Sequence, residues 1–232
     1  YRKLGHGFAA TLRGVYTLSS FKDDGLNNTS DAEINGNFSR EWARSLQDRR
    51  HRFAFSGTIE TPRWMGKLKF SPLFRYGSSA PFNLGTGGSD RNLDDLNNDR
   101  PLFSGNISDI TTRDPGSEFP ATLASQFSFQ TIGAKSGNLP RNAGRGPSFY
   151  TFDLNVSREF KFNDRLRLRP TVEFDNISNS TVFSYGSEFI DFAALRVTPA
   201  PTANQLAAYQ NLLIPTRTYR PRQIRIGVRF DF

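Results

Sequence analysis

The sequence contains no cysteine and only two histidines, His6 and His51. Disulfide scaffolds, thiol catalysis and zinc sites built from cysteine or histidine are therefore excluded. It also lacks any apolar run near the roughly 20 residues that a membrane-spanning helix needs, which excludes a helical membrane protein. No G-x-S-x-G motif accompanies His51, and we expect no enzymatic activity.

Apolar residues are scarce overall, but aromatic residues are not. The hydrophobic fraction is 36%, the mean hydropathy is −0.54, and yet there are 22 phenylalanines among 232 residues. So many aromatic rings are incompatible with a disordered chain, and they fit a β structure in which half of every strand faces water. The net charge of +8 is spread along the chain rather than gathered in one basic arm, so we do not expect nucleic acid as a partner.

Six segments alternate apolar and polar residues, and a period of two predicts strands with one apolar and one polar face. They lie at about 8–20, 52–60, 67–76, 149–160, 165–175 and 221–232. Pro72 and Pro170 lie inside two of them and count against the prediction, because proline cannot donate to a strand ladder. The connections alternate between short ones, near TPRWMG and KFND, and long ones at about 21–51, 77–148 and 176–219. This alternation is typical of antiparallel strands that run between a turn side and a loop side.

The residues on the two faces favour a transmembrane barrel over a soluble sandwich or barrel. Aromatic residues lie near strand ends on the apolar face, as an interfacial girdle requires: Tyr16, Tyr76, Phe160, Phe230 and Phe232. The polar face, which we expect to line the lumen, carries Arg165, Arg167, Arg169, Glu173, Asp175, Arg225, Arg229 and Asp231. We expect these charges mainly to pair between neighbouring strands, with attraction of anionic solutes as the alternative.

Six strands are too few for a barrel, since the smallest single-chain examples have eight. The chain starts without methionine or a leader, and we expect it to be the C-terminal part of a larger barrel or one of several subunits. Seven stretches then carry a family resemblance. They are YTLSSFKDDG (16–25), EWARSLQDRRHRFAFSG (41–57), RYGSSAPFNL (75–84), DRNLDDLNNDRP (90–101), RNAGRGPSFYTFDLNVSREF (141–160), VEFDNISNSTVF (172–183) and PRQIRIGVRFDF (221–232).

In this order and spacing, the chain resembles the C-terminal barrel portion of TonB-dependent outer-membrane receptors of the Oar-like type. The resemblance implies a barrel of 22 strands in the bacterial outer membrane, a plug domain in its lumen, and energised uptake of a scarce solute through the TonB complex. The plug and the earlier strands would precede residue 1. It also implies that the barrel-assembly machinery recognises the terminal strand, through Ile224, Ile226, Val228, Phe230 and Phe232.

Two features of the long connections have competing interpretations. Asp90, Asn92, Asp94 and Asp99 are spaced like calcium ligands, but Asp95 stands where the turn glycine of such a loop belongs, so a loop rich in Asx turns is the favoured interpretation and no cofactor is expected. Residues 201–215 form the one candidate helix, bracketed by prolines.

Two functions other than energised uptake remain open. One is a structural or adhesive barrel whose loops bind another cell, and the other is a passive porin assembled from several such chains.

Overall fold

The computed structural model describes residues 2–3, 7–25, 32–86, 90–118, 120–134, 136–163, 165–184, 189–191, 213–215, 217–219 and 221–232. Six long strands dominate it: β2 (Ala9–Leu18), β5 (His51–Glu60), β6 (Leu68–Gly77), β11 (Phe149–Arg158), β13 (Arg167–Asp175) and β17 (Gln223–Asp231). Each lies within the range expected from the sequence or extends one residue past it. The fold is thus all-β, as the period of two predicts.

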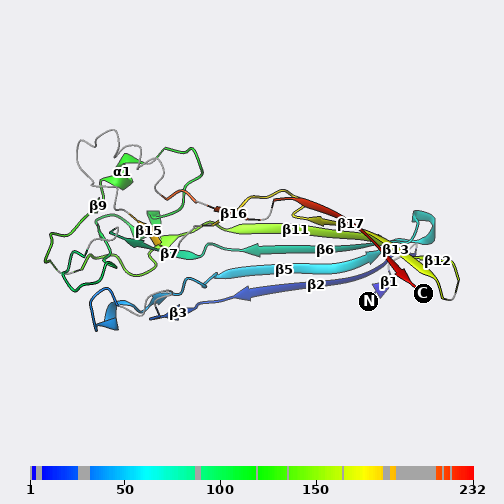
Figure 1. The fold of residues 1–232 in the computed structure, drawn as a ribbon, viewed down its shortest axis with the longest axis horizontal. Helices are drawn as coiled ribbons and strands as arrows, with labels where there is room; N and C mark the ends of the chain where they lie inside the picture. Colours follow the sequence, from blue (N-terminus) through cyan, green and yellow to red (C-terminus); the bar gives the residue numbers. More distant parts are fainter. Residues whose placement is uncertain are drawn as a thin grey trace.

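The six strands are neighbours in one antiparallel sheet, in chain order (Figure 1). The two-residue strand β1 (Arg2–Lys3) pairs with β2 at one edge, and β17 pairs with β13 at the other. Short β12 (Phe160–Lys161) continues the line of β11 along β13. The sheet is curved and open: no pairing between its two edges closes it among the described residues.

The register places most of the apolar positions on one face, with Val15 and Leu73 as exceptions on the other. Residues directly opposite in an antiparallel pair share a face, and Tyr16 faces Phe53, Phe152 faces Phe74, and Val172 faces Ile226. A slip of one residue in any pair would move that strand's apolar residues to the other side. The six alternations found in the sequence therefore add up to one continuous apolar face and one continuous polar face.

Both strand prolines coincide with gaps in the ladders. The β5–β6 ladder skips the positions between Ser56↔Leu73 and Ile59↔Phe70, where Pro72 lies. The β11–β13 ladder stops at Ser157↔Thr171 and resumes at Phe160↔Leu168, on either side of Pro170. Each proline stays in register with the neighbouring strand on its other side: Pro72 lies opposite Leu154 of β11, and Pro170 opposite Val228 of β17. The missing N–H therefore interrupts one ladder without shifting the strand.

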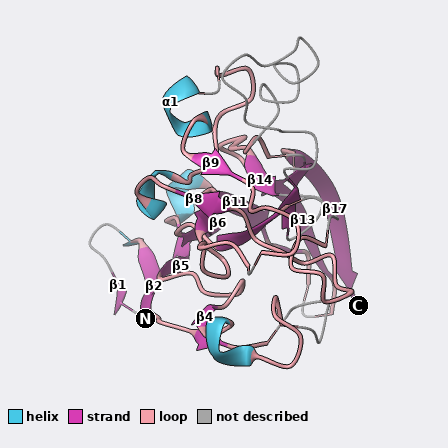
Figure 2. Cartoon of the chain, turned by 90° about the vertical axis from the view of Figure 1, so that its left-hand side faces the viewer, coloured by secondary structure: helices cyan, strands magenta, loops and turns pink. Residues whose placement is uncertain are grey.

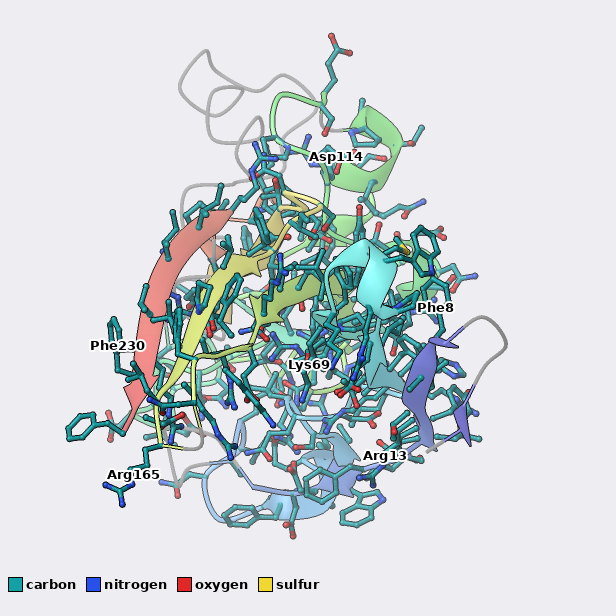
Figure 3. The ribbon with its side chains drawn as sticks, turned by 90° about the vertical axis from the view of Figure 1, so that its right-hand side faces the viewer. Phe8, Arg13, Lys69, Asp114, Arg165 and Phe230 are labelled. Atoms are coloured by element: carbon teal, nitrogen blue, oxygen red, sulfur yellow. The ribbon has the colours of Figure 1, made fainter. Side chains whose placement is uncertain are left out.

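Strand β13 begins two residues later than expected. The Asn163 side-chain oxygen accepts the backbone N–H groups of Arg165, at 3.0 Å, and Leu166, at 2.6 Å. This Asx turn draws residues 165 and 166 into the connection. Arg165 was therefore wrongly assigned to the strand, and Figure 3 shows its side chain extending away from the sheet.

Short turns and long connections lie at opposite ends of the sheet (Figure 1). The turn end holds residues 61–67, with the 3-10 helix η3 (Arg63–Met65), and both chain termini. The loop end holds the described residues of the three long connections, which we call the loop cap (Figure 2). For these residues, the expected segregation of long loops on one side is confirmed.

The loop cap contains the other short elements. They are β3 (Lys22–Asp23), β4 (Ala43–Arg44), β7 (Pro81–Gly85), β8 (Leu102–Phe103), β9 (Phe127–Ser128), β10 (Gly144–Arg145), β14 (Val182–Ser184), β15 (Phe189–Asp191), β16 (Arg217–Tyr219), η2 (Phe38–Arg40), η4 (Ile107–Asp109) and α1 (Ala121–Ala124). The predicted helix at 201–215 falls largely on 201–212, outside the described residues. None of the helices described is long and apolar enough to cross a bilayer.

The tightly packed apolar core lies in the loop cap, away from the sheet. It consists of Phe82, Leu84, Phe103, Ile110, Phe127, Leu139 and Leu213. In a soluble sandwich, the inward strand faces would supply this core. Here the connections bury their own apolar residues, while the apolar face of the sheet packs against no second layer in the described part of the chain.

Candidate functional site

The apolar face of the sheet is the first candidate functional surface. Its side chains stay accessible: Tyr16 is 60% exposed, Ile226 80% and Phe230 62%. Figure 3 looks along the strands and shows Phe230 outside the arc of the sheet and Lys69 within it. The apolar face is therefore the outer, convex one. A continuous apolar surface of this size on a protein needs an apolar environment to cover it.

Two aromatic rows bound this face. At the loop end, Tyr16, Phe53, Tyr76 and Tyr150 lie opposite one another across four strands. At the turn end, Phe160 and Phe230 both pair with Leu168, and the exposed ring of Trp64 lies on the neighbouring turn.

The separation of the two rows matches a bilayer. Tyr150 and Phe160 are ten residues apart in one continuous register. A strand rises about 3.3 Å per residue, so the rows are roughly 33 Å apart along the strand, or roughly 25 Å apart along the normal of a bilayer if the strands tilt by about 40°. This is the height of the apolar band in outer-membrane barrels. The spacing supports the girdle interpretation.

The polar face carries ion pairs between neighbouring strands. Arg225 contacts both Glu173, at 3.4 Å, and Asp175, at 2.7 Å, and Arg75 contacts Asp153 at 2.6 Å. The pairing expected for Glu173 and Asp175 is thus present. Asp231 instead pairs with Arg229 of its own strand, at 2.8 Å.

Near the turn end, Arg169 pairs with Glu159, at 2.7 Å, a partner that the sequence did not suggest. Glu159 lies between β11 and β12, where Pro170 interrupts the ladder. Arg167 lies on the same face, opposite Asp231 in the register. Seven of the eight predicted lumen residues therefore lie on the polar face of β13 and β17, Arg165 being the exception.

A buried ionic network joins the long connections of the loop cap. Arg100 is 2% exposed, and its guanidinium donates to both carboxylate oxygens of Glu41, at 2.9 and 3.0 Å, and contacts Glu33 at 2.5 Å. Arg141 donates to the Glu41 carbonyl, at 2.8 Å, and to the Asp23 side chain. Two arginines from the 78–148 connection thus hold two glutamates and an aspartate from the 19–50 connection.

Burial raises the pKa of Glu33, although Arg100 and then Arg40 act against this shift. The nearby Glu41 carboxylate adds to the increase. Glu33 is 2% exposed, and Arg40 reaches it at 3.3 Å from a more open position. The network therefore depends on Arg100 as its one deeply buried cation in contact with both glutamates.

Asp48 organises the start of the first long connection. Its side chain accepts hydrogen bonds from the Phe21 backbone N–H, at 3.2 Å, from Ser19 and from Arg44, at 2.8 Å. Burial acts to raise the pKa of Asp48, but these hydrogen bonds outweigh it and hold the pKa below the usual 3.8. The charged carboxylate is thus the form that the fold stabilises.

Acidification should release this contact. A carboxyl with a lowered pKa stabilises the folded state above its unfolded pKa, and this stabilisation is lost as the pH falls through the folded value. We expect the protection of the Phe21 amide, relative to its intrinsic exchange rate at the same pH, to fall below about pH 3.8, reflecting a local loss of roughly 1–3 kcal/mol. Asp48→Asn should show fast exchange already at neutral pH and little further change with acid. An acid response of equal size in Asp48→Asn would contradict this assignment.

The 90–99 segment folds around its own carboxylates. Asp90 accepts the N–H groups of Asp94, at 3.2 Å, and Asp95, at 2.8 Å, and Asp99 accepts those of Arg91 and Asn92. Asp95 adopts a left-handed conformation with φ of 68°, which the glycine of a calcium loop would normally supply. The bonds are those of the Asx-turn interpretation. No group of three acidic or histidine side chains that could hold a metal is found in the described ranges, and the expectation that this loop holds no cofactor stays a prediction.

The C-terminal signature lies on a free edge. Ile224, Ile226, Val228 and Phe230 point to the apolar face of β17, and Phe232 follows the strand with its side chain fully exposed. The far edge of β17 pairs with no other strand among the described residues. This strand can therefore accept another strand by edge addition.

The comparisons with known proteins agree with this geometry. The family model described as outer membrane beta barrel domain matches residues 2–218. No curated protein and no solved structure matches the chain. The match covers five of the six long strands, the turn at 61–67 and the loop cap, and it ends before β17. The chain therefore belongs to the outer membrane beta barrel domain family and is located in the bacterial outer membrane.

Proposed function

We propose that this chain is the C-terminal part of a plugged, TonB-dependent barrel that takes up a scarce extracellular solute. The resemblance of seven ordered stretches to Oar-like receptors supports this proposal. Under this proposal, the rest of the barrel and the plug precede residue 1, and the complete barrel has about 22 strands. The TonB complex acts through that plug, and the barrel-assembly machinery inserts the protein through its terminal strand.

One structural observation carries the proposal furthest. The described residues of the long connections form a packed cap at one end of the sheet, with an apolar core and a buried ionic network. Large barrels hold plugged lumens, whereas a passive pore needs an open water-filled one. A capped mouth above a charged lumen suits capture followed by gated release, and it needs no covalent chemistry.

The proposal predicts two properties of the full-length protein. In a planar bilayer bathed in potassium chloride, it should show no steady conductance, because the plug and cap close the lumen. It should also bind the purified periplasmic domain of TonB, and deleting the segment before residue 1 should abolish that binding.

The same two measurements distinguish the alternatives. Steady conductance without TonB binding would overturn the proposal in favour of a passive porin. Absence of both conductance and TonB binding would overturn it in favour of a structural or adhesive barrel.

A further inference from the structure

The positive charge of the polar face is unevenly distributed along the strands. Toward the loop end, Arg75 and Arg225 are each neutralised by carboxylates within the sheet. Toward the turn end, Lys67 and Lys69 form no ion pair with any described residue, and nor does Arg63 on the connecting turn. Part of the excess positive charge of the polar face therefore lies at the end opposite the loop cap.

These cations line a single hollow of about 820 Å³ on the concave side of the sheet. Its cationic lining residues are Arg63, Lys67, Lys69, Lys161 and Arg169, and its acidic ones are Glu60 and Glu159. Five positive charges against two negative ones leave an excess of three. Figure 3 looks into this end of the sheet, with Lys69 inside the arc. We call this hollow the anion basin.

The lining residues come from separate elements that the fold brings together. Lys69 lies on β6, Lys161 on β12, Arg169 on β13 and Arg63 on η3. Lys67 occupies a left-handed backbone conformation, with φ of 53°, directly after left-handed Gly66. Such a conformation costs a non-glycine residue about 1 kcal/mol or more. Glu159 is already held by Arg169, at 2.7 Å, and contacts Lys161 at 3.7 Å, so Glu60 is the one acidic lining residue outside these pairs.

We propose that the anion basin binds a small solute carrying several carboxylate or phosphate groups. Lysine and arginine are the side chains that hold such groups through charge-assisted hydrogen bonds. The volume lies within the roughly 300–1,000 Å³ of small-molecule sites. A compact polyanion suits five cations that converge on one hollow, whereas an extended acidic protein segment would also have to pass the carboxylates that pair with Arg75 and Arg225. This inference requires the polar face to line the lumen, but it does not require coupling to TonB.

The test is citrate binding to the full-length protein in detergent micelles, measured by isothermal titration calorimetry. The wild type should bind citrate, and raising the salt concentration should weaken binding because the contacts are ionic. The triple variant Lys67→Gln, Lys69→Gln, Lys161→Gln should bind at least about tenfold more weakly. All three side chains are exposed and lie outside the apolar face, so the variant should retain the heat-modifiable mobility of a folded barrel.

A matched control removes the same charge elsewhere. Arg13, Arg165 and Arg222 are exposed and do not line the basin, and their joint change to glutamine should leave citrate affinity within about twofold. Equal losses in both triple variants would overturn the proposal in favour of a general effect of net charge. It would also be overturned if the wild type bound no citrate, or if it bound a glutamate-rich peptide that citrate could not displace. None of these results depends on TonB binding or conductance, so this inference can fail separately from the proposed function.

Discussion

Replacing Arg100 by methionine is expected to open the loop cap while leaving the six-stranded sheet intact. The change leaves the buried carboxylates of Glu33 and Glu41 without the buried guanidinium group that contacts both of them. Breaking a buried ion pair from one side costs about 3–5 kcal/mol. Because 1.4 kcal/mol is a factor of ten, amide exchange in residues 32–48 and 90–101 should accelerate on the order of 10²- to 10³-fold, as measured by hydrogen-exchange mass spectrometry. Exchange in β5 and β11 should not change.

Two further variants test whether the buried charge is the cause. Arg40 contacts the same Glu33 from a more open position, with 31% of its side chain exposed, and Arg40→Met should cost at most about 1 kcal/mol. Adding Glu33→Gln and Glu41→Gln to Arg100→Met removes the unpaired charges and should restore much of the protection. Equal effects of Arg100→Met and Arg40→Met would show that burial of the network is not what stabilises the cap.

The second large effect is expected on the terminal strand. Ile226 lies near the middle of β17 on the apolar face and is 80% exposed. An arginine on the lipid side at mid-membrane costs about 2–4 kcal/mol. Ile226→Arg should therefore lower the amount of folded, heat-modifiable protein recovered from outer membranes, and should reduce its stability to urea after refolding into lipid vesicles.

The adjacent residue is a matched control on the opposite face. A side chain added at Gly227 meets nothing within 4 Å and would extend toward the lumen, where water solvates a charge. Gly227→Arg should therefore be recovered at close to the wild-type level. If Gly227→Arg proved the more damaging change, the faces would be assigned the wrong way round, with the guanidinium groups toward the lipid.

The sheet could be predicted from the sequence because the alternation of neighbouring residues determines which face of a strand each side chain occupies. Alternation at residues such as Leu166 to Phe174 sets the face of each side chain, and pairing then only has to match apolar face to apolar face. The sequence also marks the turn at Asn163, although the importance of its side chain as a cap at 165 and 166 emerges only with the geometry.

The loop cap and the anion basin could not be predicted in the same way. Arg100, Glu41 and Arg141 look like ordinary surface charges, because the long connections have no period that would mark a buried side. Their burial results from contacts between two different connections, in which the contacting residues are 59 to 118 positions apart in the sequence. The basin likewise depends on which lysines remain unpaired once β6, β11, β12 and β13 are assembled in one sheet. Neither property can be inferred from spacing along the chain.

The long-range contacts of the cap have a consequence for the order of assembly. Arg141 and Asp23 are 118 positions apart, so their contact closes a loop that contains β5 and β6. Closing so large a loop is entropically unfavourable until the intervening hairpin is in place. Maturation of the exterior surface should therefore lag behind insertion of the strands. During that interval, newly inserted molecules should be cut by an externally added protease within 19–50, and become resistant once the cap has closed.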